Sequence, residues 1–339
     1  MKKEHIAVLG GGTWGATLAS HLAKQGHDVI IWEFVKEVAD HLKKNRSLKT
    51  LPELKIPAQV QITNDLAETL KGRDVLLSVT PSHAVRATFS AAVAGGALTP
   101  GALVISATKG IENGTFSTMS QIISQVFPGV GELVILTGPS HAEEVAMGQP
   151  VALVSASHSK PASERVRDMF SSDIFRVYTG KDPIGAEIGG SLKNIFAVAC
   201  GIVDGLKLGD NTKAALMTRG LTEMARLGKV LGAETMTFFG LSGLGDLIVT
   251  CGSKHSRNRL LGEKIGSGKT LAAALAEMTM VAEGVKTAES AYHLGKSKKV
   301  ELPIVGEVYK ILFENKPPRD SIRDLMSRQV GAEMEGVVV

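Results

Sequence analysis

Four clusters of polar residues stand beside glycines or small side chains, where a ligand can approach the backbone. They are Thr108-Lys109-Gly110, Gly138-Pro139-Ser140-His141-Ala142, Lys193-Asn194, and Gly243-Leu244-Gly245-Asp246 with Ser256-Arg257-Asn258. Arg257 would lie in the first turn of a helix, where a cation opposes the helix dipole and its placement favours a bound anion. Lys193 lies one turn from Gly189, Gly190 and Ser191. These clusters predict a site for a small anionic substrate.

Each cluster also has a purely structural interpretation. Lys109 could be a surface lysine, and Gly138-Pro139-Ser140 could be only a turn. A lysine in the middle of a helix, such as Lys193, is usually solvated. Ser256 can cap a helix, and His141 could be a general acid–base or a turn residue, of which we favour the turn residue. The elements around the clusters decide between these interpretations.

A glycine-rich turn near the N-terminus gives a clearer signal. Gly10, Gly12 and Gly15 form the pattern G-x-G-x-x-G, which follows the strand-like His5–Leu9 and opens the helix-like Thr13–Gln25. In that context Gly10 allows a tight turn, Gly12 lets a pyrophosphate approach, and Gly15 lets the helix pack close to the strand. The helix N-terminus then offers free N–H groups to phosphates. We expect a dinucleotide to bind here.

Glu33 stands at the end of the second strand-like run, 18 residues after Gly15. An acidic residue at this position commonly binds the ribose 2′-hydroxyl of NAD and repels the 2′-phosphate of NADP. We therefore favour NAD and leave NADP possible.

The run Gly266-Ser267-Gly268-Lys269-Thr270 looks like the end of a phosphate-binding P-loop, but Glu263 stands where that motif needs glycine. We interpret it as a connection between helices.

The first half of the chain alternates short apolar runs with helical periodicity, which indicates a mostly parallel sheet covered by helices. The expected strands are His5–Leu9, Val29–Trp32, Asp74–Val79, Leu103–Ala107, Leu133–Leu136, Val151–Ser155 and Phe175–Tyr178. The first two clusters follow two of these strands, at the edge of the sheet where ligands bind in open parallel sheets. We predict an α/β Rossmann-type dinucleotide-binding domain over residues 1–184.

After residue 184 only helical periodicity remains, and we predict an all-α substrate domain over residues 185–330. The expected helices are Gly185–Val203, Thr212–Leu231, Ser256–Ile265, Leu271–Met278, Thr287–Lys296, Ile304–Glu314 and Ser321–Arg328. Residues 331–339 show no periodicity, and we expect a frayed tail.

Composition excludes several classes of protein. The two cysteines, Cys200 and Cys251, provide neither a disulfide scaffold nor a four-cysteine zinc site, and we expect no metal. Only 4% of residues are aromatic and the net charge is +4, which argues against a nucleic-acid-binding surface. No uncharged apolar stretch is long enough to cross a membrane, and His5 begins a strand too early for a signal peptide to precede it. We expect a cytoplasmic location.

Taken together, the clusters resemble NAD(P)-dependent glycerol-3-phosphate dehydrogenase over nearly the whole chain. The segments that carry the resemblance are GGGTWG (10–15), ATKG (107–110), GPSHA (138–142), LKN (192–194), GLGD (243–246), SRN (256–258) and VAEG (281–284). The resemblance implies a helical domain like that of 6-phosphogluconate dehydrogenase. It also implies reversible hydride transfer between NAD(P)H and dihydroxyacetone phosphate, which yields sn-glycerol 3-phosphate for phospholipid synthesis. A homodimer is the expected assembly.

The resemblance also assigns roles to residues. Lys193 would be the catalytic base, with Asp246 beside it and Lys109 reaching both cofactor and substrate. Cofactor contacts would come from the glycine turn and from Thr13, Trp14, Ala142, Arg257, Val281 and Glu283. Substrate contacts would come from Gly138, Ser140, Asn194, Ser256, Arg257 and Asn258. Two positions depart from the family pattern: Glu33 stands where many bacterial relatives carry His or Arg, and His141 replaces an expected Phe or Thr.

A lysine ordinarily titrates near ~10.4, which is too high for an efficient base at neutral pH. We predict that partial burial and the nearby cations Lys109 and Arg257 lower the pKa of Lys193, against the opposing effect of Asp246.

The alternatives to a glycerol-3-phosphate dehydrogenase are a related 3-hydroxy acid or ketopantoate dehydrogenase and a non-catalytic dinucleotide sensor. A sensor would keep the glycine turn but would not need Lys193, Lys109 and Asp246.

Overall fold

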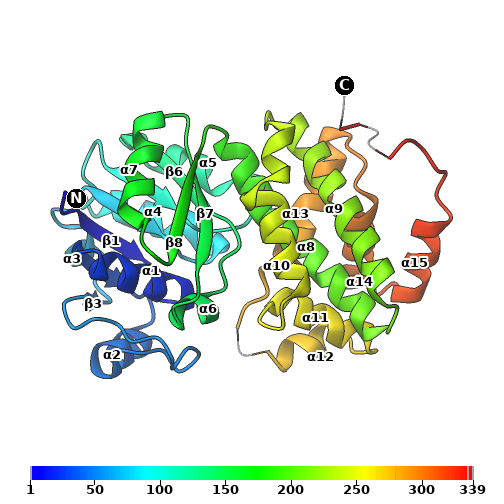
Figure 1. Cartoon of the computed structure of the whole chain (residues 1–339), viewed down its shortest axis with the longest axis horizontal. Coiled ribbons are helices and arrows are strands. Elements are labelled where there is room, and N and C mark those ends of the chain that lie inside the picture. The colour runs from blue at the N-terminus through cyan, green and yellow to red at the C-terminus, as the bar shows by residue number, and fades with distance from the viewer. Residues whose placement is uncertain (1, 279, 334–335, 338–339) are drawn as a thin grey trace. The chain divides into compact units, whose positions relative to one another are not determined.

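A computed structural model describes residues 2–278, 280–333 and 336–337 of the chain. The chain forms two compact units (Figure 1). Unit 1 comprises Met1–Lys109 and Ser117–Pro183, and unit 2 comprises Gly110–Phe116 and Ile184–Val339. The fold class expected from the sequence is confirmed, since a Rossmann-type sheet precedes an all-helical unit.

Unit 1 is built on one eight-stranded sheet in the order β3-β2-β1-β4-β5-β6-β7-β8. All neighbouring strands are parallel except β6 and β7, which are antiparallel. The strands are β1 His5–Leu9, β2 Asp28–Trp32, β3 Gln61–Thr63, β4 Val75–Ser78, β5 Leu103–Ser106, β6 Glu132–Thr137, β7 Val151–Ala156 and β8 Phe175–Gly180. The sequence did not predict β3, because this three-residue edge strand has no apolar run to mark it.

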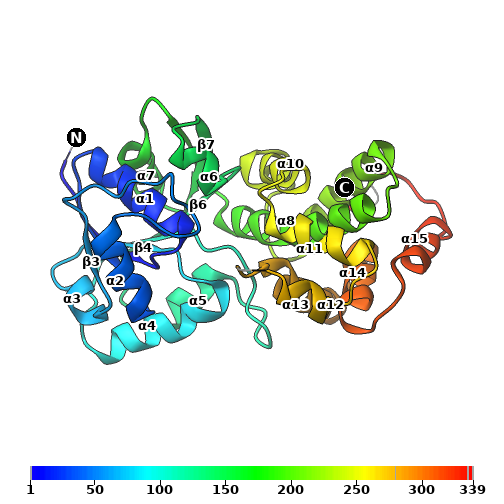
Figure 2. The ribbon, with the colours of Figure 1, turned by 90° about the horizontal axis from the view of Figure 1, so that it is seen from below.

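Helices cover both faces of this sheet, which is why most positions of its central strands are apolar. One face lies under α1, α6 and α7, and the other lies under α4 and α5 (Figure 2). The helical segments of unit 1 are α1 Thr13–Lys24, α2 Lys36–Asn45, α3 Leu66–Leu70, the 3-10 turn η1 Ser82–Ala84, α4 Val85–Ala94, α5 Met119–Val126, α6 Ala142–Ala146 and α7 Lys160–Phe170.

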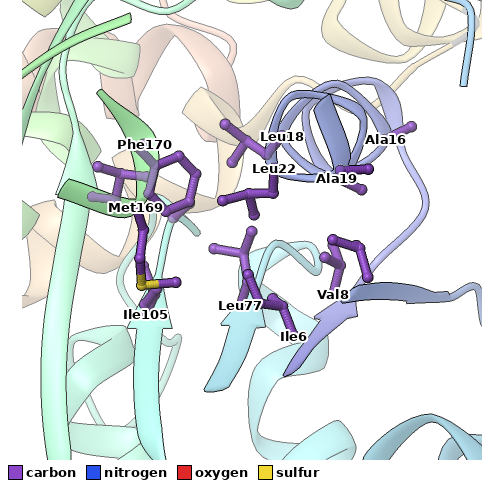
Figure 3. Close-up of a cluster of buried hydrophobic side chains, with 14 of the residues drawn as sticks. Ile6, Val8, Ala16, Leu18, Ala19, Leu22, Leu77, Ile105, Met169 and Phe170 are labelled. Atoms are coloured by element: carbon purple, nitrogen blue, oxygen red, sulfur yellow. The ribbon is translucent and has the colours of Figure 1, made fainter. Parts of the chain in front are cut away.

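The packing of α1 on the sheet fixes the glycine turn that precedes it. Leu18 and Leu22 of α1 lie over Val8 of β1 and Leu77 of β4, and Phe170 of α7 closes the side of the cluster (Figure 3). All five side chains are fully buried. Each contributes about 1.5–3 kcal/mol through burial. The turn between β1 and α1 is therefore held from both of its ends.

All named secondary-structure elements in the described residues of unit 2 are helices or helical turns. Its elements are α8 Pro183–Gly205, α9 Asp210–Val230, the 3-10 turn η2 Thr235–Phe239, the π-helical turn η3 Leu241–Gly245, α10 Asp246–Gly252, α11 Arg257–Gly266, α12 Leu271–Ala276, α13 Glu283–Lys298, α14 Pro303–Phe313 and α15 Pro318–Met326. Among the described residues, α8 is the one helix long and apolar enough to cross a membrane, and the apolar stretch concerned is entirely buried inside the fold. It is the core helix of unit 2.

Glycines let α11 lie directly on α8. A side chain at Gly201 would meet the carbonyl oxygen of Arg259 at 1.9 Å, and one at Gly262 would meet that of Val198 at 1.9 Å. Gly205 and Gly266 repeat the contact one turn further on. Small residues spaced by four thus bring the two backbones together. This contact places the start of α11, with its Ser256-Arg257-Asn258 cluster, beside α8.

Two segments differ from the sequence-based expectation. Residues 110–116 fall within the predicted first domain but belong to unit 2, because Gly110 N–H donates to Ser191 Oγ at 2.9 Å and Ile111 is buried in the core of that unit. Within the expected frayed tail, Val337 is buried and the carbonyl of Glu333 accepts a hydrogen bond from Arg219. Residues 334–335 and 338–339 of that tail lie outside the described residues.

Candidate active site

The turn between β1 and α1 needs glycine for steric reasons. Gly10 has φ +117°, and a Cβ there would lie 2.8 Å from the carbonyl oxygen of Val79. A Cβ on Gly15 would lie 2.0 Å from the carbonyl oxygen of Gly10. At Gly12, by contrast, nothing lies within 4 Å of the position that a Cβ would take. Gly10 and Gly15 therefore close the turn, while Gly12 leaves its backbone open.

The N-terminus of α1 is prepared for an anion. Gly12 is its N-cap and provides no side chain to accept from the first N–H groups, and the first turn carries no acidic residue. Thr13 and Trp14 follow in that turn and are half-buried. Free N–H groups at the positive end of a helix bind phosphate. The turn fits the pyrophosphate of a dinucleotide.

Glu33 holds a carboxylate against this turn. Its Oε2 accepts from the N–H of Gly11 at 3.0 Å, and its Oε1 accepts from the N–H of Val35 at 3.0 Å. Two backbone donors thus fix the side chain at the end of β2. A negative charge lies beside the second glycine of the turn.

Lys109, Gly138 and Ser140 meet at the carboxyl ends of the neighbouring strands β5 and β6. Lys109 Nζ donates to the carbonyl of Gly138 at 3.2 Å and lies 3.4 Å from Ser140 Oγ. Ser140 Oγ in turn donates to the carbonyl of Gly138 at 2.8 Å. Gly138 has φ +141°, a conformation that favours glycine. An ammonium group is therefore held at this edge by neutral oxygens.

The next two residues begin the short helix α6. Ala142 is its first residue and is buried, and His141 precedes it as N-cap without a side-chain capping bond. A small side chain at this position takes up little of the space beside the sheet edge. The position of His141 directly before a helix agrees with its interpretation as a turn residue.

In unit 2, Lys193 of α8 is buried against an acidic partner. It is 7% exposed, and its Nζ forms an ion pair with Asp246, which is 1% exposed. Nζ also donates to Thr250 Oγ1 at 2.7 Å, and Thr250 Oγ1 donates to the carbonyl of Asp246 at 2.6 Å. The solvated interpretation of this lysine is therefore excluded. A charged pair taken out of water needs such complementary contacts to be stable.

The backbone explains how this pair forms. A Cβ at Gly189 would lie 2.6 Å from the carbonyl oxygen of Ser242, and one at Gly243 would lie 2.1 Å from that of Phe238. Gly189 lets the chain at 242–243 lie on α8, and Gly243 lets that chain fold back closely on Phe238 of η2. The π-helical turn η3 then runs directly into α10, so that Asp246 stands at the junction. Such turns recur at functional sites because they re-aim the next side chain.

The sequence predicts no helix over residues 246–252, and Thr250 is absent from the candidate residues. On a helix, Thr250 stands four residues after Asp246 and therefore on the same face. That spacing would have identified it if α10 had been predicted.

Asn194, Asn258 and Gly284 are connected by hydrogen bonds in unit 2. Asn258 Nδ2 donates to Asn194 Oδ1 at 2.9 Å, and Asn258 Oδ1 accepts from the N–H of Gly284 at 2.9 Å. Glu283, the first residue of α13, is half-buried, and Val281 is exposed. The predicted start of this helix at Thr287 was four residues late.

The start of α11 carries Ser256 and Arg257. Ser256 is buried and caps the helix, since its Oγ accepts from the N–H of Arg259 at 3.2 Å. Arg257 is exposed in the first turn, and no described carboxylate pairs with it. A guanidinium at the positive end of a helix is poised for an external anion.

A surface hollow of about 480 Å³ lies elsewhere in unit 2, between α13, α14 and α15. It is lined by Tyr292, Lys310 and Asp324 among others, and shares no residue with the four clusters. Lys310 already pairs with Glu307 at 2.7 Å. Among the described residues, no group of three His, Cys, Asp or Glu side chains is placed to hold a metal ion.

A Rossmann-type sheet with an open glycine turn, followed by a helical unit with a buried lysine–aspartate pair, defines a class: the NAD(P)-dependent dehydrogenases with a helical second domain. Two family models narrow this class. The N-terminal model of NAD-dependent glycerol-3-phosphate dehydrogenase matches residues 5–163, and the C-terminal model matches residues 182–323. The chain belongs to the NAD-dependent glycerol-3-phosphate dehydrogenase family.

Individual relatives agree with this assignment. The chain is 46% identical to glycerol-3-phosphate dehydrogenase [NAD(P)+] of Citrifermentans bemidjiense, over 97% of this chain and 99% of the relative. It is also similar to the crystal structure of glycerol-3-phosphate dehydrogenase from Coxiella burnetii, with a TM-score of 0.91, 34% identity, and coverage of 96% and 99% of the two chains. A ketopantoate reductase from Ralstonia eutropha shares only the fold, with a TM-score of 0.57 and 15% identity over 95% of this chain and 100% of that chain.

Proposed function

We propose that the chain catalyses the reversible reduction of dihydroxyacetone phosphate to sn-glycerol 3-phosphate. The observation that carries this proposal is the buried ion pair of Lys193 with Asp246, in which Lys193 also donates to Thr250. Asn194, which carries an amide side chain, follows Lys193 on α8. A buried ammonium held by a carboxylate and a hydroxyl is suited to proton exchange with a substrate oxygen. Within this family, the class of substrate is a phosphorylated three-carbon ketone or alcohol.

The roles of the residues follow from their chemistry. Lys193 Nζ donates the proton to the C2 oxygen of the ketone, and it takes that proton back in the oxidative direction. Asp246 and Thr250 orient the ammonium group. When bound, the nicotinamide ring supplies or accepts the hydride. One proton and one hydride together convert the ketone to the alcohol, so charge and atoms balance.

We assign binding of the substrate phosphate to the exposed guanidinium of Arg257. Arg257 offers a planar pair of donors that matches phosphate oxygens, and the N-terminus of α11 adds a favourable dipole. Lys109 adds a second cation, with Gly138 and Ser140 beside it and Asn194, Ser256 and Asn258 as the remaining contacts. These assignments come from residue chemistry and from the family pattern.

In unit 1, Gly10, Gly12 and Gly15 with Thr13 and Trp14 hold the pyrophosphate of the dinucleotide, and Ala142 is a further contact. The family pattern adds Arg257, Val281 and Glu283 of unit 2 as cofactor contacts. The fixed carboxylate of Glu33 favours the two ribose hydroxyls of NAD over the 2′-phosphate of NADP. Our proposal is therefore an NAD-preferring enzyme.

We further propose that the enzyme works in the cytoplasm as a homodimer and supplies glycerol 3-phosphate for phospholipid synthesis. The two free, buried cysteines suit a reducing compartment. Size-exclusion chromatography with light scattering reads the assembly, and a mass of about twice 35.7 kDa is expected.

A panel of ketones tests the reaction. Oxidation of NADH and of NADPH is followed by absorbance with dihydroxyacetone phosphate, unphosphorylated dihydroxyacetone and ketopantoate. The phosphorylated ketone with NADH should give the highest kcat/KM. Faster turnover of ketopantoate would refute the proposed substrate, and binding of NADH without turnover of any ketone would indicate a sensor.

A further inference from the structure

Asp204 joins three helices of unit 2. It lies in the last turn of α8, and its Oδ2 forms an ion pair with Arg259 Nε of α11 at 2.6 Å. Its Oδ1 forms a second ion pair with Lys213 Nζ in the first turn of α9. The side chain of Asp204 is 16% exposed and those of both cations are 19% exposed, so water and salt screen these pairs much less than pairs on an open surface. The carboxylate is therefore a fixed junction between α8, α9 and α11.

The backbone of Arg259 is held at the same place as its side chain. Its carbonyl oxygen would lie 1.9 Å from a Cβ at Gly201, so only glycine lets it approach α8 this closely. Its N–H donates to Ser256 Oγ at 3.2 Å, which caps α11. Gly201 and Asp204 are three residues apart on α8 and therefore lie on one face of that helix. The face of α8 that receives the backbone of α11 thus also carries the carboxylate that pairs with the Arg259 guanidinium.

Arg257 stands two residues before Arg259 in the first turn of the same helix. A helix turns by about 100° per residue, so the two side chains leave α11 about 200° apart. Arg259 leaves toward Asp204 on α8, and Arg257 leaves on the opposite side of α11, where it is exposed. Asp204 also neutralises the charge of Arg259, while Arg257 keeps its charge for an external anion. The direction of Arg257 is therefore tied to the anchoring of Arg259.

We propose that Asp204 is a positioning residue for recognition of the substrate phosphate. By holding Arg259 on α8, it keeps the first turn of α11 rotated so that Arg257 points away from α8 and toward the phosphate. This inference rests on the proposed function, in which Arg257 binds the phosphate of the ketone. Asp204 acts at one remove from the substrate, and Lys213 holds its carboxylate in place from α9.

Glu263 provides a matched control within the same cluster. Its Oε2 lies 3.4 Å from Arg259 Nη1, four residues further along α11, and its side chain is 43% exposed. A pair within one helix cannot hold that helix on another, and an exposed pair contributes little to stability. Glu263→Gln and Asp204→Asn each remove one negative charge beside Arg259. Only Asp204→Asn removes the ion pair between α11 and α8.

The test measures reduction of dihydroxyacetone phosphate and of dihydroxyacetone by NADH, well below the Tm of every variant. We expect Asp204→Asn to raise KM for the phosphorylated ketone about tenfold, with its kcat and the kcat/KM for dihydroxyacetone nearly unchanged. Glu263→Gln should stay within about twofold of wild type for both ketones. Arg259→Gln removes the same ion pair from the other side and leaves Asp204 paired with Lys213. It should therefore show the same phosphate-selective rise in KM, and it decides the test if Asp204→Asn does not fold.

Coupling to Arg257 is measured in a double variant. Because Asp204 acts through Arg257, Asp204→Asn should add little to the KM increase that Arg257→Ala causes. Losses that multiply would overturn the inference, and so would an unchanged KM in Asp204→Asn or Arg259→Gln. Equal losses with both ketones would mean that Asp204 only stabilises the fold, which also overturns it. These outcomes leave the proposed function intact, whereas a wild-type chain that reduces no ketone would refute the proposed function and this inference with it.

Discussion

Removing both members of the Lys193–Asp246 pair should destabilise unit 2 by clearly less than the sum of the two single removals. At hydrogen-bond separation and an effective dielectric constant near 20, two opposite charges attract by about 5 kcal/mol. Each variant, Asp246→Asn or Lys193→Met, leaves the other charge buried without its partner. Breaking such a pair costs about 3–5 kcal/mol. The double variant leaves no buried charge and should cost clearly less than the sum.

Thermal unfolding followed by circular dichroism measures these effects. For a unit of about this size, a loss of 3–5 kcal/mol lowers Tm by roughly 10 °C. The matched control is Lys229→Met, an exposed lysine on α9 of the same unit, which should leave Tm within about 2 °C. Single variants that melt like the control, or a double variant equal to the sum of the singles, would show that the pair is not coupled as described.

Three further predictions concern the cofactor, the substrate and pH. Glu33→Gln removes the charge beside Gly11, and the kcat/KM ratio of NADPH to NADH should rise about tenfold; an unchanged ratio would show that Glu33 does not select the cofactor. Arg257→Ala should raise KM about 10- to 100-fold for dihydroxyacetone phosphate and far less for dihydroxyacetone. Equal losses would show that Arg257 does not bind the phosphate. Burial raises the pKa of Glu223 to about 7, against hydrogen bonds from Ile304 and Val305. This carboxyl stabilises the fold in its neutral form, so its contribution is complete below its ordinary pKa of 4.5 and is lost as pH rises through 7. Urea unfolding should therefore show wild type losing about 3 kcal/mol relative to Glu223→Gln between these pH values, and parallel curves would contradict this.

The sheet was predictable because its strands are buried on both faces and therefore read as continuous apolar runs. His5–Leu9 was predicted with its exact bounds, whereas the edge strand Gln61–Thr63 has no such run. The core helix α8 was predicted from its periodicity. A periodic pattern reports burial within one element, but it does not report which elements touch.

For the same reason, the contacts of the candidate site could be predicted only in part. The family resemblance predicts Asp246 beside Lys193. Thr250 is not predicted, because it lies on a short helix that follows glycines, and glycines do not indicate a helix. Glycine is needed at positions Gly189 and Gly284 because another backbone segment approaches each of them closely. The same holds for residues 110–116, which follow the sheet in sequence and fold with unit 2. Each of these facts depends on distant segments meeting, and no local pattern encodes that.

The most direct test of the central claim is the turnover of dihydroxyacetone phosphate and NADH by Lys193→Ala, with and without a small primary amine. We expect this variant to lose about 10²- to 10⁴-fold in kcat while still binding NADH, as measured by its fluorescence. Added methylammonium should restore part of the activity, since it can donate the missing proton. If the variant keeps about a tenth or more of wild-type turnover without the amine, this result contradicts the assignment of Lys193 as the proton donor.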